Sequence, residues 1–230
     1  MTAGLTHGQT AALVRLADSA FPSGAFSHSF GLETAIAEGR VHDEETLAGW
    51  LDGYLVDAWA TLDGAALALA LRDGVDAEML DGVVTAATHA PEVRAANARM
   101  SAAVFDAYAA MGITSSRLRA YDEAVRAGRA LGVPALAFGL AYDALEICWE
   151  PAFVACASAT LAGLAAVGTR AVPLGQRATA RVLWNARDAI ERALAEAAAM
   201  TSPEELGAQA PAQEIDALAH RLLDGRLFAS

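Results

Sequence analysis

The stretch Pro151–Gly168, PAFVACASATLAGLAAVG, holds 18 consecutive residues without a charge. That length approaches what a helix needs to cross a membrane. Most of these residues, however, are Ala, Gly, Ser, Thr and Cys, and few are large and apolar. A helix that is apolar on all sides is also typical of a protein core, where small residues let neighbouring helices approach closely. We therefore predict a central helix enclosed by other helices, and no membrane span.

The composition of the whole chain favours the same fold. Of the 230 residues, 55% are hydrophobic, and about a quarter are Ala, the best helix former. Val, Ile, Thr and aromatic residues are too sparse for a large sheet. Only residues 201–213 resemble a linker, and no repeat of fixed period is present. The sequence predicts one all-α domain over residues 1–230, a single-domain helical bundle of roughly ten helices.

Capping residues and prolines mark where the expected helices begin and end. Apolar residues recur at helical spacing after Asp43, and prolines open several later segments. The expected helices include 47–58, 91–111, 116–132, one from Pro134, 151–172, a long amphipathic helix over 175–200, and a last short helix over 214–223.

Charge and residue types exclude several classes of protein. The formal net charge is −12, and all 16 basic residues are Arg. Nucleic-acid binding needs a concentrated basic face, so no nucleic-acid partner is expected. The absence of Lys removes the P-loop lysine and any Schiff-base lysine, and no cofactor is predicted. Cys148 and Cys156, expected to be buried, and the lack of a signal-peptide pattern indicate a cytoplasmic protein.

No catalytic or metal-binding pattern emerges from the polar residues. The loop "FPSGAFSHSFGLET" at 21–34 contains serines and His28, but it lacks the Gly-x-Ser-x-Gly of a nucleophile elbow. No two of the five histidines have i,i+3 or i,i+4 spacing, and no CxxC is present. We predict no catalytic residue and no metal site. A helical enzyme with a cryptic Ser/His or carboxylate site remains the alternative; a transcription regulator would need a basic recognition helix.

The same loop has two structural interpretations. Pro22 and Gly24 turn the chain, and Ser27 or Ser29 is placed to cap the helix that follows. Its three phenylalanines, including Phe26, are too many for a free surface loop. The loop is therefore either a packed turn or a surface that binds a partner.

These residues resemble the N-terminal signature of the UreF family of urease accessory proteins. The matching positions are Ala20, Phe21, Pro22, Gly24, Phe26, His28, Ser29, Gly31, Leu32 and Glu33. Three more blocks resemble the family in the expected order: Glu92-x-Arg94-x-x-Asn97, Val172-Pro173-Leu174-Gly175-Gln176, and His220 with Arg226-Leu227-Phe228-x-Ser230. The chain departs from the family pattern near Gly163, at Thr179-Ala180 and at Asp224-Gly225.

The resemblance implies an all-α maturation factor that is not an enzyme. Such a protein forms a homodimer and bridges UreD (also called UreH), which contacts apo-urease, to the GTPase UreG. The assembly uses GTP hydrolysis to insert nickel into the urease active site. Its partners would thus be UreD/UreH, UreG and, through the complex, apo-urease.

The resemblance also implies a set of site residues. Partner binding is expected at Phe26, His28, Ser29, Glu33, His220, Arg226, Leu227 and Phe228. Backbone shape is expected to depend on Pro22, Gly24, Gly31, Pro173 and Gly175. We expect Phe26 and His28 to be exposed toward the GTPase, and residues 224–230 to form a docking tail. In the alternative, Leu227 and Phe228 fold back onto the helical body.

Overall fold

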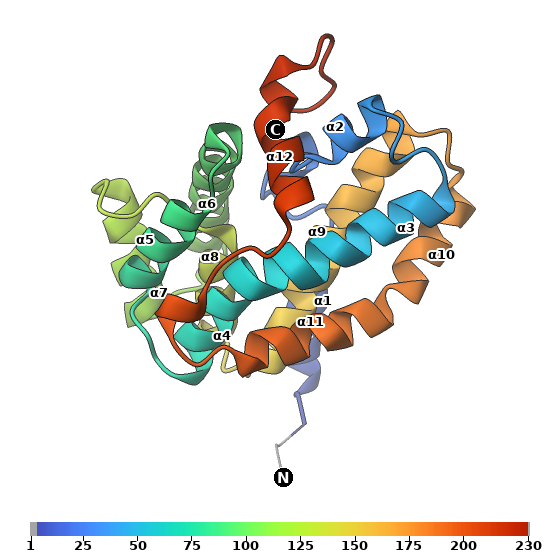
Figure 1. Ribbon diagram of the computed structural model, residues 1–230. Helices are drawn as coiled ribbons and strands as arrows, with labels where there is room; N and C mark the ends of the chain where they lie inside the picture. The colour runs from blue at the N-terminus through green and yellow to red at the C-terminus, as the bar shows by residue number, and fades with distance from the viewer. Residues whose placement is uncertain (1–3, 230) are drawn as a thin grey trace.

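A computed structural model describes residues 4–229 of the chain, with all of their side chains except that of Phe26. Within these residues the chain is 72% helical and contains no strand, and 11 helices are present when the continuous run Glu44–Arg72 counts once. The predicted all-α fold is confirmed (Figure 1). The α-helices are α1 (His7–Leu16), α2 (Leu32–Ala37), α3 (Glu44–Gly53), α4 (Ala65–Arg72), α5 (Ala77–Ala87), α6 (Pro91–Met111), α7 (Ser116–Arg126), α8 (Pro134–Ala144), α9 (Trp149–Ala171), α10 (Gln176–Asn185), α11 (Arg187–Ala199) and α12 (Pro211–Ala219).

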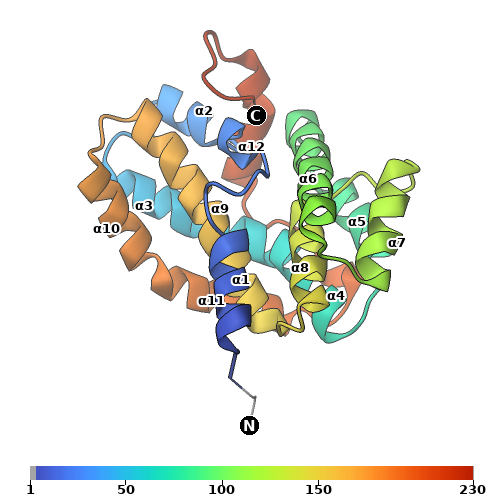
Figure 2. The ribbon, with the colours of Figure 1, turned by 180° about the vertical axis from the view of Figure 1, so that it is seen from behind.

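The uncharged stretch forms most of α9, which runs through the middle of the molecule (Figures 1 and 2). It packs against α1, α2, α3, α4, α8, α10 and α11. Phe153, Ala157 and Ala165 are completely buried on it. The small residues that α9 carries let this many helices approach it, as its sequence predicted.

Two helices are long and apolar enough to cross a membrane by length and composition alone. They are Glu44–Arg72 and Trp149–Ala171, and 67% and 50% of their most apolar windows are buried inside the protein. Because a core helix meets the same criteria, this is weak evidence for a membrane span.

A π-helical segment, Tyr54–Gly64, joins α3 to α4 in one continuous helix. The connection after α11 lies along it. There the Gly207 amide donates to the Thr61 carbonyl at 3.2 Å, and the Gln209 amide donates to the Asp57 carbonyl at 2.6 Å. Helices of the π type are rare and occur most often at functional sites. This one directs Trp59 and Asp63 toward a partly open cavity.

Several boundaries differ from those predicted. The single helix expected over 175–200 is two helices that meet at Ala186, a break that no helix-breaking residue announces. The break lets α10 pack on α3 and α9 while α11 packs on the π-helical segment. Cys148 precedes α9 and is exposed, whereas Cys156 is buried as expected.

Candidate functional site

The N-terminal loop is a packed structure. Phe21 is buried against Tyr108 and Phe138, with ring centroids 5.7 Å and 5.5 Å away. Gly24 adopts a left-handed conformation with φ +74° and starts a short 3₁₀ helix, Ala25–Ser27. The packed-turn interpretation of the loop therefore holds for Phe21.

The residue that precedes α2 is Gly31, and neither Ser27 nor Ser29 caps this helix, contrary to prediction. Gly31 has φ +95°, which side-chain-bearing residues rarely adopt. A Cβ at this position would lie 2.8 Å from the Ala217 amide nitrogen and 3.0 Å from the Asp216 Cβ. The glycine thus lets the start of α2 lie directly against α12, and this close approach is why no serine cap fits here.

Arg40 and Thr34 fasten the same two helices. The Arg40 guanidinium pairs with the Asp216 carboxylate, which is almost completely buried on α12. The Thr34 hydroxyl donates to the Asp216 carbonyl at 2.9 Å. Neither contact was predicted, because the sequence gives no sign that a residue near position 35 meets one near 216.

Glu33 is the centre of the site. Its carboxylate is buried and lies 2.8 Å from His220 Nε2. It also accepts hydrogen bonds from two amides of the C-terminal segment, that of Leu227 at 2.6 Å and that of Phe228 at 3.2 Å. One side chain near the N-terminus therefore holds the last residues of the chain.

His220, which is completely buried, connects Glu33 to a second carboxylate. Its Nδ1 lies 2.9 Å from Glu92 Oε2, and Arg226 donates to Glu92 Oε1 at 2.7 Å. Burial raises the pKa of Glu92, but hydrogen bonds from His220 and Arg226 outweigh it, so the pKa lies below its ordinary value. Each ring nitrogen of His220 thus lies within hydrogen-bonding distance of a carboxylate oxygen, one on Glu33 and one on Glu92.

The C-terminal segment is packed, which corrects the prediction of a free docking tail. Phe228 is only 7% exposed, with the Arg170 guanidinium 5.9 Å from its ring centroid. The Ala229 amide donates to the Ser27 carbonyl at 2.7 Å, so the segment lies on the N-terminal loop. Leu227, by contrast, is 68% exposed. The fold-back alternative is correct for Phe228 and wrong for Leu227.

The predicted exposure of His28 is also wrong. His28 and Ser29 are both buried, and the C-terminal segment lies on the loop that carries them. Burial lowers the pKa of His28, and the nearby charge of Arg99 lowers it further. The side chain of Phe26 lies outside the described residues, so the prediction for it stays open.

The remaining predicted loop residues are less distinctive. Pro22 is exposed in the turn after Phe21. Pro173 and Gly175 lie in the exposed connection between α9 and α10, close behind Arg170. Gly175 has an ordinary φ of −73° at the start of α10, so nothing in its backbone requires glycine.

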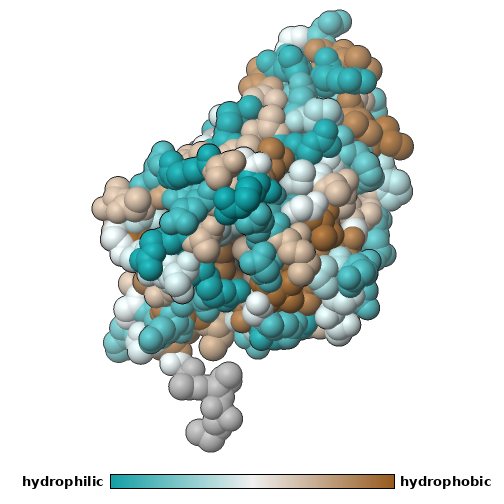
Figure 3. Space-filling view, turned by 90° about the vertical axis from the view of Figure 1, so that its left-hand side faces the viewer, coloured by the Kyte–Doolittle hydropathy of each residue, from teal (hydrophilic) through white to brown (hydrophobic). Residues whose placement is uncertain are grey.

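An apolar stripe runs along the C-terminal arm, which we define as residues 211–229. Ile215 and Leu222 are 64% and 75% exposed, and Leu218 and Leu227 are exposed as well. Figure 1 shows the arm standing at one end of the molecule beside α2, and Figure 3 shows apolar side chains among polar ones where it projects. Ile215, Leu218 and Leu222 are three and four residues apart on consecutive helical turns, so they share one face, and exposed apolar faces mark surfaces that bind other proteins.

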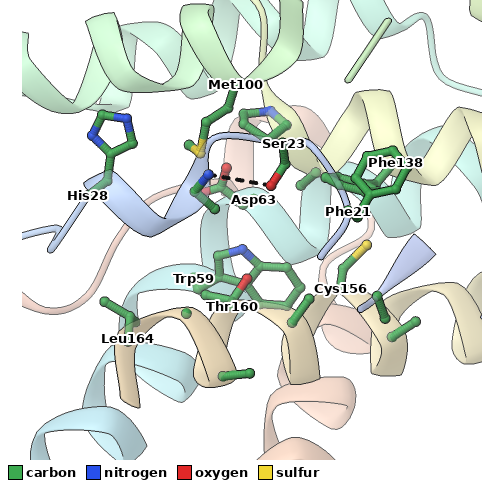
Figure 4. A pocket seen from close by; sticks show the side chains of 18 of the residues that line it. Phe21, Ser23, His28, Trp59, Asp63, Met100, Phe138, Cys156, Thr160 and Leu164 are labelled. Atoms are coloured by element: carbon green, nitrogen blue, oxygen red, sulfur yellow. Dashed lines mark hydrogen bonds between the residues drawn. The ribbon is translucent and has the colours of Figure 1, made fainter. Parts of the chain in front are cut away.

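A partly open cavity of about 150 Å³ lies between the N-terminal loop, α6, α8, α9 and the π-helical segment (Figure 4). It is mainly apolar, with Trp59, Met100 and Phe138 among its lining residues. Asp63 also lines it, and burial raises the pKa of this carboxyl to about 7. Burial raises the pKa of the Cys156 thiol to about 12, which makes it a poor nucleophile.

One polar side chain of this cavity, that of Ser23, is held within the loop itself. The hydroxyl of Ser23 accepts a hydrogen bond from the Ala25 amide at 3.4 Å, as Figure 4 shows. Among residues 4–229, no group of three or more His, Cys, Asp or Glu could hold a metal ion. Three of the four sequence blocks meet through Glu33, His220 and Glu92 and hold the C-terminal arm in place. Fold and site together define an all-α protein in which these blocks build one end of the molecule beside an exposed apolar stripe.

Comparison with known proteins gives the family. A family model described as UreF matches residues 41–187. A urease accessory protein UreF from Paenarthrobacter aurescens (strain TC1) is 39% identical over 219 residues, which cover 95% of this chain and 97% of that protein. UreF proteins from Arthrobacter sp. (strain FB24) and Lachnoclostridium phytofermentans are 34% and 32% identical, each over 95% of this chain and 96% and 97% of their own lengths. The chain belongs to the UreF family.

Proposed function

We propose that this chain is a urease maturation factor, a chaperone-like scaffold that bridges UreD/UreH and the GTPase UreG. It supports the GTP-dependent insertion of nickel into apo-urease and catalyses no reaction itself. It acts in the cytoplasm as a homodimer. The proposal rests on membership of a family whose relatives compared above are urease accessory proteins.

The observation that carries the proposal is the assembled C-terminal arm. Three of the four blocks that resemble the family supply its fastening: Glu33, Glu92, and His220 with Arg226. The arm held by these contacts carries a stripe of four exposed apolar side chains. Burying these polar groups costs free energy, yet the arm that they hold exposes apolar side chains to solvent. This arrangement suits a scaffold protein, because a partner covers the apolar surface when it binds. We assign the stripe to UreD/UreH.

Urease activation tests this function directly. Apo-urease, UreD and UreG should be co-expressed with and without this chain, in medium containing nickel. Active urease is expected only when the chain is present, and the purified chain alone should hydrolyse neither urea nor GTP. Equal urease activity in its absence would contradict the proposal.

The alternative, a helical enzyme with a cryptic site, has one observation in its favour. Asp63 places a carboxyl of raised pKa in an apolar cavity, which is an arrangement that some acid–base catalysts use. A substrate would also need a nucleophile or an oxyanion site there, and the lining residues provide neither in a recognisable arrangement. Asp63→Asn should therefore leave urease activation in the assay above unchanged.

A further inference from the structure

A second surface of the molecule is an open groove beside the N-terminal loop. The loop forms one wall, α6 forms another, and the end of the C-terminal arm forms a third. Its lining residues are Ser23, Gly24, Ser27, His28, Glu92, Arg99, Met100, Ala103, Arg226, Phe228 and Ala229. The groove is distinct from the apolar stripe, since none of Ile215, Leu218 or Leu222 lines it.

Arg99 carries an unused charge in this groove. Its side chain is exposed on α6, and within residues 4–229 it makes no ion pair or hydrogen bond. Arg226, which lines the same groove, is already engaged by Glu92 at 2.7 Å. A guanidinium has a planar fork of donors that matches a carboxylate in two-point contact, and Arg99 presents this fork to solvent.

Among residues 4–229, no other charge in the groove neutralises Arg99. Glu92 is the one carboxylate among the described lining residues, and it is shared by His220 and Arg226. His28 favours its neutral form, because burial and Arg99 itself lower its pKa. The groove is therefore locally positive on a chain whose formal net charge is −12. Charges more than about 8–10 Å away are largely screened at physiological ionic strength, so this local sign decides what binds.

We propose that the groove binds an acidic segment of a protein partner, with Arg99 holding one of its carboxylates. Next to this charge the groove is lined by half-buried Ala103 and by Met100 and Phe228, which are largely buried, and the hydroxyls of Ser23 and Ser27 offer polar contacts. The matching segment thus carries an Asp or Glu beside an apolar side chain. A long polyanion such as nucleic acid would extend over the negative surface beyond the groove, whereas a short acidic segment does not.

This inference rests on the proposed function, which supplies the partner to be tested, the GTPase UreG. Binding of purified UreG to this chain should be measured by calorimetry for the wild type, Arg99→Ala and Arg99→Glu. The matched control is Arg177→Glu, because Arg177 is an exposed arginine on α10 that also makes no ion pair among residues 4–229. We expect at least tenfold weaker binding for Arg99→Ala, a larger loss for Arg99→Glu, and a change below twofold for the control.

Two further readings make the test specific. Melting temperatures should be nearly the same for all variants, since Arg99 makes no ion pair or hydrogen bond among residues 4–229. Between 50 and 300 mM NaCl, the affinity of the wild type should fall more steeply than that of Arg99→Ala, because one charge pair is missing from the variant. If both Arg99 variants bind UreG with the affinity and salt dependence of the wild type, the inference is overturned and the proposed function stays intact. No binding of UreG by the wild type would overturn both.

Discussion

Glu33 and His220 are 187 positions apart in the chain, and their side chains meet at 2.8 Å in the interior of the protein. The contact joins the second helix to the end of the C-terminal arm. Because Glu33 also accepts the amides of Leu227 and Phe228, one carboxylate determines where the last residues lie. The site is therefore a fastening between the two ends of the sequence.

Glu33→Gln should loosen this fastening. The amide of Gln has one acceptor oxygen in place of two, so at least one buried partner of Glu33 loses its hydrogen bond, at a cost of about 1–3 kcal/mol. We expect a lower melting temperature and faster amide hydrogen exchange at residues 227 and 228. Glu38→Gln, at an exposed carboxylate close to the end of the same helix, is the control and should change stability by less than about 0.5 kcal/mol. Equal stability of the two variants would show that Glu33 contributes little.

Gly31→Ala and Gly24→Ala separate backbone strain from steric conflict. Both glycines have positive φ, but only Gly31 lacks room for a Cβ. Gly24→Ala should cost about 1 kcal/mol, as expected for strain alone. Gly31→Ala should cost at least about 3 kcal/mol, because α2 must also move away from α12. Chemical denaturation measures both values, and equal costs would contradict the close packing.

Asp63→Asn should change how stability depends on pH. The pKa of Asp63 is raised by burial from 3.8 to about 7 in the folded protein, so the folded state binds the proton more tightly than the unfolded state. Ionising the buried carboxyl therefore lowers the stability of the folded protein. This loss of stability is absent below pH 3.8, grows as pH rises toward 7, and is constant above pH 7. At about 1.4 kcal/mol per pKa unit its upper bound is about 4 kcal/mol, and we expect about 2.

To isolate the effect of Asp63, the free energy of unfolding should be measured for the variant and the wild type at pH 4, 6 and 8, and the two values subtracted at each pH. This difference should increase in favour of the variant and level off above pH 7. A difference that stays constant over this range would mean that the carboxyl has a normal pKa.

A chain that ends at Gly225 should lose both stability and partner binding. It lacks buried Phe228 and the amides that satisfy Glu33, which together are worth about 3 kcal/mol or more.

Leu227→Ser removes only an exposed side chain, so its melting temperature should match the wild type. Combined with Leu222→Ser, it should weaken binding of UreD/UreH. An unchanged melting temperature after truncation would restore the interpretation of a free tail.

The fold was predictable because its signals are local. Ala content, prolines at helix starts and the uncharged stretch of α9 each act within a few turns of helix. The break at Ala186 was missed, since it is set by what α10 and α11 pack against. The residues of the site were named through a resemblance, but their arrangement was not foreseen. The burial of His28 and of Phe228 accompanies contacts between the two ends of the chain, which no local pattern encodes.

The fastening at Glu33 also sets an order of events during synthesis. Domains form from the N-terminus onward as the chain emerges from the ribosome. Glu33 is made early, whereas its amide donors at Leu227 and Phe228 follow 194 and 195 positions later. Until His220 and these two residues emerge, the Glu33 carboxylate lacks the contacts that it has in the folded protein. A product that stalls before them therefore cannot close this end of the molecule, which, before any complex forms, would distinguish it from a chain that carries them.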